Sequence, residues 1–97
     1  MNEKIFEGIV EQIRNERKYQ EGCWGHETDD KNTINDWVVF INRYTAKAAP
    51  QRCDGDDHEL GFHTNLVKAG AIIFAALEAQ ERNGVMPPRH YDGVQDG

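Results

Sequence analysis

The feature that most constrains the fold is an alanine-rich, apolar stretch at residues 66–82, LVKAGAIIFAALEAQER. We expect a helix that begins between Asp56 and Leu60 and ends at Asn83, because Gly84 is a favourable C-terminal stop. The apolar surface of this helix extends beyond what two partner helices would cover. The residues that extend it are Ile72, Ala75, Ala76 and Ala79. This excess predicts that the chain forms a homo-oligomer.

Two other segments have the apolar periodicity of amphipathic helices. The first begins after Asn2, a predicted N-cap, and continues to about Tyr19. The second begins at Thr33, which forms a predicted capping box with Asp36. Pro50 ends it, because proline has no amide hydrogen to continue the helix. The chain therefore contains three predicted helices.

The segments outside these helices are polar and contain glycine. Residues 22–31 predict a loop that carries Trp24. Residues 85–97 show no apolar periodicity and predict a tail that is mobile or docked on a partner. The predicted fold is all-α, a small three-helix unit over residues 1–84 that dimerisation completes into a larger bundle. Its predicted core consists of Ile9, Ile13, Trp37, Val38, Ile41, Val67, Phe74 and Leu77.

Size and charge narrow the classes of function. A chain of 97 residues fits one domain. The formal net charge of −6 argues against direct nucleic acid binding, which usually needs a basic surface. The absence of an apolar run of about 20 residues argues against a membrane span. We expect a cytoplasmic protein in which Cys23 and Cys53 are reduced thiols.

The densest cluster of acidic residues and histidines does not match a known metal site. It consists of Asp54, Asp56, Asp57, His58, Glu59 and His63. A calcium loop needs alternating oxygens around a glycine turn and a closing glutamate, and this cluster lacks that pattern. Structural zinc sites have close cysteine pairs, which are missing from the set Cys23, His26, Cys53 and His58. We therefore predict no metal site and no cofactor. The chain also contains no serine that could act as a nucleophile, and we predict no catalytic residue.

Short motifs follow one another in a characteristic order between residues 13 and 82. The first helix ends in ERKYQ at residues 16–20, a W-G pair follows at Trp24, and a helix start over residues 33–37 precedes an alanine-rich final helix. This order resembles the MazG-like, all-α nucleoside triphosphate pyrophosphohydrolase group, particularly its short phage and prophage members. The resemblance implies a helical bundle formed by dimerisation. It also implies a phage-type protein acting in the host cytoplasm.

The chain departs from that group where its magnesium ligands should lie. The group's site resembles E-E-x-x-E on the second helix and E-x-x-D on the third. The corresponding stretches here are RYTAK at residues 43–47 and NLVK at residues 65–68. Cationic side chains cannot hold Mg²⁺ beside a triphosphate. No catalytic residue of the group carries over, and we predict no magnesium-dependent hydrolysis.

Two kinds of binding function remain, with one enzymatic alternative. Arg43, Lys47 and Lys68 are candidates to bind the phosphates of a sequestered nucleotide, or are simply charges on exposed helix faces. Trp24, Asp29 and Asp30, with the acidic surface and the tail, are candidates to bind a host protein and inhibit a host defence; the phage association rests on the resemblance alone. The alternative is a magnesium-dependent nucleoside triphosphate pyrophosphohydrolase. Its carboxylates would come from Glu11, Glu16, Asp36 or Glu78.

Overall fold

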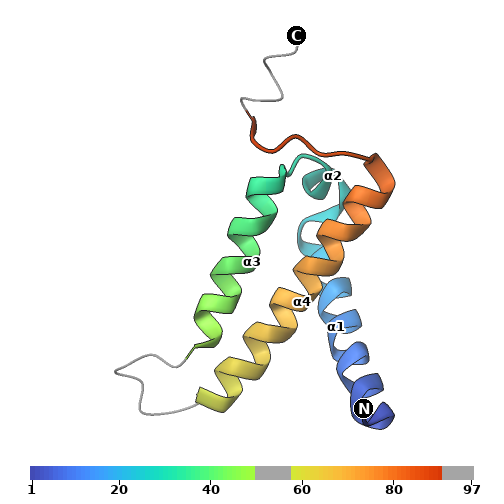
Figure 1. Ribbon diagram of the computed structural model, residues 1–97. Helices are drawn as coiled ribbons and strands as arrows, with labels where there is room; N and C mark the ends of the chain where they lie inside the picture. The colour runs from blue at the N-terminus through green and yellow to red at the C-terminus, as the bar shows by residue number, and fades with distance from the viewer. Residues whose placement is uncertain (50–57, 91–97) are drawn as a thin grey trace.

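The computed structural model describes residues 1–49 and 58–90, with the side chains of residues 58–60 left out. Within these ranges the chain forms four helices and no strand: α1 is Glu3–Cys23, α2 Gly25–Asp30, α3 Ile34–Ala48 and α4 His58–Asn83 (Figure 1). The predicted all-α fold is confirmed. The predicted loop over residues 22–31 is wrong, because most of it forms α2. No helix in the described ranges is long and apolar enough to cross a membrane.

Helix α1 begins where its capping residue predicts and ends later than expected. The Asn2 side chain accepts a hydrogen bond from the Ile5 amide at 3.1 Å. The helix continues through Gly22, and the chain changes direction at Gly25, whose φ of +74° favours glycine. A glycine within a helix lowers stability by only about 1 kcal/mol, which tertiary contacts can offset. Gly22 therefore does not end α1.

The N-terminus of α3 is capped by neighbouring residues and by residues about fifty positions later in the sequence. The predicted capping box is confirmed: the Thr33 amide donates to Asp36 Oδ2 at 2.9 Å, and the Asp36 amide donates to Thr33 Oγ1 at 3.2 Å. The amides of Ile34 and Asn35 donate to the carbonyl oxygens of residues 87 and 88, each at 3.0 Å. These bonds satisfy the amides that the first helical turn leaves unpaired. Residues 87–88 are therefore docked on α3, at the start of the segment predicted to be a tail.

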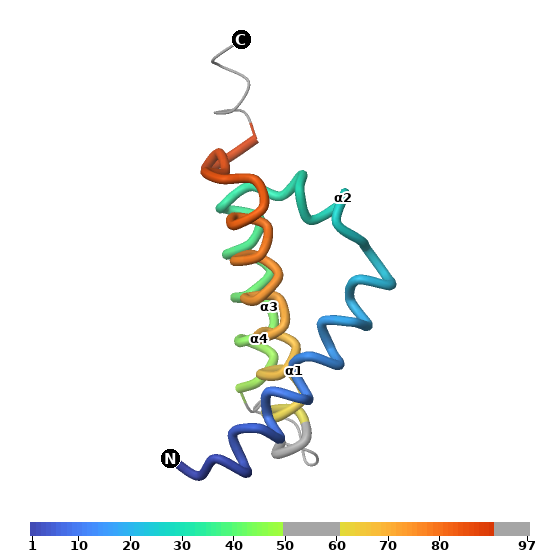
Figure 2. Tube along the Cα trace, turned by 90° about the vertical axis from the view of Figure 1, so that its right-hand side faces the viewer, coloured from blue at the N-terminus to red at the C-terminus, as the bar shows by residue number. Residues whose placement is uncertain are grey.

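The core lies between α3 and α4, which run side by side (Figures 1 and 2). Trp37 from α3 packs against Ile72, Ala75 and Ala79 of α4, which are between 0% and 6% exposed. Small side chains at a helix contact allow the two axes to approach closely. The prediction that Ile72, Ala75 and Ala79 form an outer, oligomer-forming surface is therefore wrong. Ala76 is partly buried beside them.

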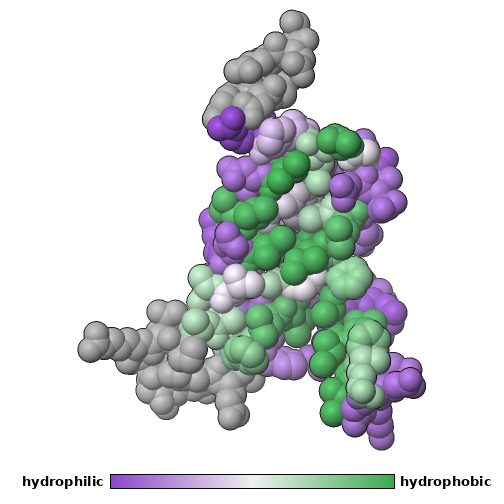
Figure 3. Space-filling view, viewed as in Figure 1, coloured by the Kyte–Doolittle hydropathy of each residue, from purple (hydrophilic) through white to green (hydrophobic). Residues whose placement is uncertain are grey.

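Half of the predicted core residues are exposed in the single chain. Trp37 is buried, and the half-buried residues are Ile13, Ile41 and Val67. The exposed residues, with their exposed fractions, are Ile9 (41%), Val38 (47%), Phe74 (52%) and Leu77 (55%). In Figure 3 apolar side chains gather over α3, α4 and the N-terminal part of α1. Of the larger apolar residues of α4, Ile72 is buried against α3, whereas Leu66, Ile73, Phe74 and Leu77 are exposed.

Helix α1 crosses α4 obliquely and then leads away to α2 (Figure 2). The crossing is close at Gly70, where an added Cβ would lie 3.1 Å from Ile13 Cδ1. His63 of α4 contacts the Gln12 side chain of α1. Side chains from the C-terminal half of α1 and from α2, α3 and α4 then line a common pocket.

Candidate ligand pocket

All four helices contribute to a pocket of about 260 Å³. We call it the aromatic pocket. It is lined by Arg17, Gln20, Trp24, Thr28, Asp29, Asn32, Trp37, Phe40, Arg43, Tyr44, Ile72 and Ala75.

Aromatic side chains form much of its wall. Trp37 and Phe40 pack edge to face, with ring centroids 6.5 Å apart and an interplanar angle of 88°. Trp24 lies between α1 and α2 and is 51% exposed, and Tyr44 is half-buried. Trp37 Nε1 is buried and has no hydrogen-bond acceptor in the described part of the chain. An unpaired buried donor costs about 1–3 kcal/mol.

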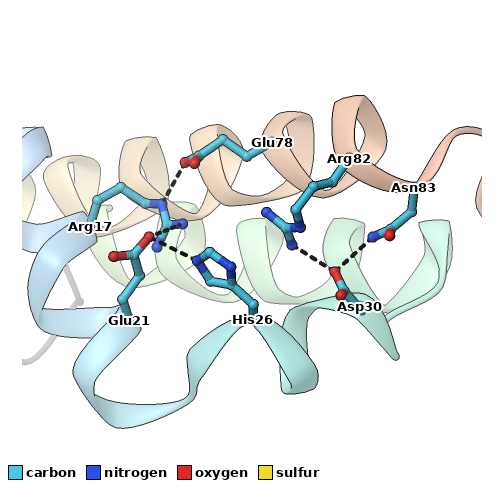
Figure 4. A network of polar contacts seen from close by, with 7 residues as sticks. All are labelled: Arg17, Glu21, His26, Asp30, Glu78, Arg82 and Asn83. Carbon is cyan, nitrogen blue, oxygen red and sulfur yellow. Dashed lines mark hydrogen bonds and ion pairs between the residues drawn. The ribbon is translucent and has the colours of Figure 1, made fainter.

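The polar side of the pocket is held by ion pairs on α1 and α4. Arg17 is only 8% exposed; its Nε donates to Glu78 at 3.0 Å, and its Nη2 donates to Glu21 at 3.1 Å. Figure 4 shows the guanidinium between these two carboxylates, with His26 also in contact with the Glu21 carboxylate. Gln20, 4% exposed, donates from Nε2 to a Glu16 carboxylate oxygen at 3.2 Å. Arg17 and Gln20 are thus fixed in place before any ligand binds.

Asp29 brings a buried carboxyl group from α2 to the same pocket. Burial raises its pKa above the usual value, and the neighbouring positive charges of Arg17 and Arg82 oppose that rise. The burial effect is the larger. A ligand that donates a hydrogen bond to the Asp29 carboxylate would therefore stabilise its ionised form.

Helix α2 is anchored by the next residue, Asp30. Its Oδ1 accepts hydrogen bonds from Arg82 at 2.6 Å and from Asn83 Nδ2 at 2.7 Å, as Figure 4 shows. The bonds lower the pKa of Asp30 below its usual value. They tie a six-residue helix, which is too short to be stable alone, to the last turn of α4. This contact keeps Asp29 and Thr28 at the pocket wall.

The structure brings some of the predicted site residues together and separates others. Arg43 lines the aromatic pocket, is exposed and makes no ion pair in the described part of the chain. Lys47 lies one turn further along α3, with Nζ 5.2 Å from the Tyr44 ring centroid. Lys68 is half-buried on α4 and does not line the pocket. The three predicted phosphate-binding cations therefore do not share one wall of it.

The candidates for partner binding are also divided. Trp24 and Asp29 line the aromatic pocket, and only Trp24 is exposed. Asp30 lies outside it and is paired with Arg82 at 2.6 Å. Binding of a host protein by these three residues stays a prediction. In the single chain Asp29 is buried near Arg17 and Arg82, and Asp30 is paired with Arg82.

Sequence reasoning missed Arg17, Gln20, Phe40 and Tyr44 as parts of a site. A signal for two of them was present: Arg17 and Gln20 continue the three- and four-residue spacing of the apolar stripe that ends at Ile13. A polar side chain on a stripe that faces the core must be paired or must face a polar cavity. Both residues are buried and hydrogen-bonded.

The described side chains bring together no group of three or more His, Cys, Asp or Glu residues that could hold a metal ion. Most of the acidic cluster considered in the sequence lies outside them, namely Asp54, Asp56, Asp57, His58 and Glu59; Cys53 is also outside. Cys23 is a free, exposed cysteine. The carboxylates of the enzymatic alternative have separate partners: Glu11 pairs with Arg14, Glu16 accepts from Gln20, Asp36 caps α3 and Glu78 pairs with Arg17.

No protein-family model matches the chain, and neither curated proteins nor solved structures include a significant match.

Proposed function

We propose that the protein binds a nucleotide in the aromatic pocket and does not hydrolyse it. One observation carries the proposal: a pocket walled by aromatic rings has a guanidinium without an ion pair, that of Arg43, among its lining groups. Aromatic rings stack on nucleobases, and guanidinium groups bind phosphate through two parallel hydrogen bonds.

The size and polarity of the pocket suit the base end of such a ligand. Its volume of about 260 Å³ lies just below the ~300–1,000 Å³ typical of drug-sized ligands, which favours a compact ring system. The Asp29 carboxylate can accept from an exocyclic amine or ring N–H, and the Gln20 amide can pair with a base edge. An acceptor that reaches Trp37 Nε1 would satisfy the unpaired donor there.

Arg43 and Lys47 suit the phosphate end. They lie one helical turn apart on α3, so their charges lie on one side of that helix. Arg17 is less suitable, because Glu21 and Glu78 already neutralise it. Phosphate binding at Arg43 and Lys47 needs no metal ion, since the side chains themselves supply the positive charge.

The arrangement of carboxylates favours binding over hydrolysis. Nucleoside triphosphate hydrolysis with magnesium needs several anionic oxygens converging on one cation beside the phosphates. At the pocket, Asp29 is the only lining carboxylate among the described residues. We therefore expect no pyrophosphate release from any standard or deoxynucleotide. EDTA-sensitive release above a no-enzyme control would refute this expectation.

Intrinsic fluorescence gives a direct binding assay, because the chain's two tryptophans, Trp24 and Trp37, both line the pocket. We expect standard and deoxynucleoside triphosphates, titrated in EDTA, to include one that quenches this fluorescence saturably. Trp24→Ala should weaken its affinity, measured by calorimetry, by about 5- to 150-fold, because loss of a stacked base costs ~1–3 kcal/mol. Arg43→Ala should weaken triphosphate more than nucleoside binding. Lys4→Ala removes an exposed cation from α1 outside the pocket and is the control.

A second candidate function is recognition of a host protein through Trp24. The supporting observation is its 51% exposure, since tryptophan is enriched among the residues that dominate interface energies. This candidate takes precedence if no nucleotide quenches the fluorescence. A phage-type role against a host defence would then be tested by capture of a host protein that Trp24→Ala no longer binds.

A further inference from the structure

Charged side chains on one flank of α1 are sorted by sign over residues 3–18; Glu21, the next charge on this flank, is paired with Arg17 at 3.1 Å. Glu3, Glu7 and Glu11 occupy its N-terminal half, and Arg14 and Lys18 occupy its C-terminal half. Intervals of three or four residues place all five on neighbouring turns of the same side. Glu11 and Arg14 pair with each other at 2.7 Å. Glu3, Glu7 and Lys18 make no ion pair in the described part of the chain, so this flank has an unpaired acidic end and an unpaired basic charge near its other end.

A groove of about 300 Å³ between α1 and α4 lies beside this flank. Its apolar lining residues are Val10, Ile13 and Phe74, and its charged lining residues are Arg14, Arg17, Lys18, Glu21 and Glu78. Phe74 is 52% exposed there. The groove is open and largely apolar, so covering it would remove apolar surface from water.

The N-terminal part of α1 offers a matching apolar side chain. Phe6 is 49% exposed. The space-filling view shows apolar surface on this part of α1, bordered by hydrophilic residues (Figure 3). One end of α1 thus carries an uncovered aromatic ring, and the other end borders an uncovered groove.

We propose that a second copy of the chain covers this surface, with the two α1 helices antiparallel about a two-fold axis near Val10 and Glu11. In this register Glu3 and Lys18 lie seven positions either side of the central pair, and Glu7 and Arg14 lie three positions either side. Glu3 and Glu7 of one copy therefore face Lys18 and Arg14 of the other, while Glu11 lies at the axis and keeps its pairing with Arg14 of its own chain. A parallel pairing of the same helices would place like charges together.

The same register places the partner's Phe6 at the groove. Phe6 lies four positions before Val10, so it stands opposite Asn15, four positions after Glu11. The α1 residues that line the groove run from Val10 to Glu21, and Asn15 lies at the middle of that span. The charge pairing sets the register, and the apolar fit, which depends on different residues, agrees with it. The surface is thus self-complementary, as a two-fold interface requires.

Sedimentation velocity on the full chain tests the proposal, with dimer expected at about tens of micromolar, well within the range of weak specific complexes. Phe6→Ala should raise the dimer dissociation constant by about tenfold or more, as for a residue central to an interface. Because the ring is exposed in the single chain, this variant should keep the helicity of the wild type in circular dichroism. A wild-type chain that stays monomeric would overturn the proposal.

Paired charge reversals test the register itself. Glu3→Lys/Glu7→Lys and Arg14→Glu/Lys18→Glu should each be monomeric, because each places four pairs of like charges across the interface. An equimolar mixture should form a dimer with one copy of each, seen by native mass spectrometry, because all four pairs are then opposite in sign. Self-association that survives either double variant places the interface elsewhere on the molecule. A mixture that stays monomeric while both variants remain helical also refutes the antiparallel register.

Discussion

Replacing Ile72 or Leu77 by alanine tests whether the core of α4 is the one in the structure or the one that sequence periodicity predicts. The two residues are aliphatic isomers on the same helix. The sequence assigns Leu77 to the core and Ile72 to an outer surface, whereas Ile72 is 6% exposed and Leu77 is 55% exposed. Each substitution removes three carbon atoms from the side chain, so the pair is matched in chemistry and differs in burial.

The expected magnitudes follow from that burial. Removing about 0.8 kcal/mol per buried methylene gives Ile72→Ala a transfer loss of roughly 2.4 kcal/mol, and the cavity left behind brings the total into the range of about 2–5 kcal/mol. Leu77→Ala removes less than half as much buried surface, so we expect about 1 kcal/mol. A domain of this size has a total stability of roughly 5–15 kcal/mol. Ile72→Ala therefore removes a large fraction of it.

Urea unfolding followed by circular dichroism measures both values. Wild type and variants should be compared at one low protein concentration, because any partner copy that covers Leu77 would add to its effect. We expect Ile72→Ala to lose at least about 1 kcal/mol more than Leu77→Ala, with similar dependence on urea concentration. Equal losses, or a larger loss for Leu77→Ala, would refute the assignment of the α3–α4 contact to the small-residue side of α4.

Three other expectations concern the helix ends and buried charge. Truncation after Gly84 removes the carbonyl groups that pair with the Ile34 and Asn35 amides, and should lower the free energy of unfolding by about 1–3 kcal/mol; an unchanged melting temperature would contradict the docking. Asp29→Asn should stabilise the protein at neutral pH, because the raised pKa of Asp29 means that folding disfavours its ionised form. This gain in stability should vanish as pH falls through the raised pKa towards 3.8. A gain that grows on acidification would contradict this expectation. The pKa of Asp30 is lowered, so the ionised carboxylate adds to folding stability above pH 3.8, and this stability is lost as pH falls through the pKa of the folded state. In urea titrations at acidic pH, Asp30→Asn should therefore lose less stability on acidification than the wild type.

Local signals in the sequence were sufficient for most helix boundaries. The capping box of Thr33 and Asp36 starts α3 where expected, and Gly84, with φ +79°, follows the last residue of α4. Such signals work because caps and left-handed stops depend on the side chains and backbone of a few neighbouring residues. The exception is residues 22–31, where Asp30 binds Arg82 and Asn83, more than fifty positions away. A local pattern contains no information about that anchor.

The candidate pocket was only partly foreseeable. Arg43 and Trp24 stood out by residue type and position, and both line it. Arg17 and Gln20 could have been identified as polar interruptions of the α1 stripe, but their neighbours across the pocket could not. The pocket exists because the tertiary arrangement brings side chains of all four helices to one place, and the close approach of α1 and α4 at Gly70 depends on which helices meet.

The sequence by itself determined that the chain is helical and that α4 is apolar over much of its circumference. Only the tertiary structure decided which side of α4 faces the core. Periodicity favoured the side with Phe74 and Leu77, because larger side chains have more surface to bury. The fold instead packs Trp37 against Ala75 and Ala79, since small residues let two helices approach closely around one large ring. That choice buries Ile72 but leaves Phe74 and Leu77 exposed on the single chain.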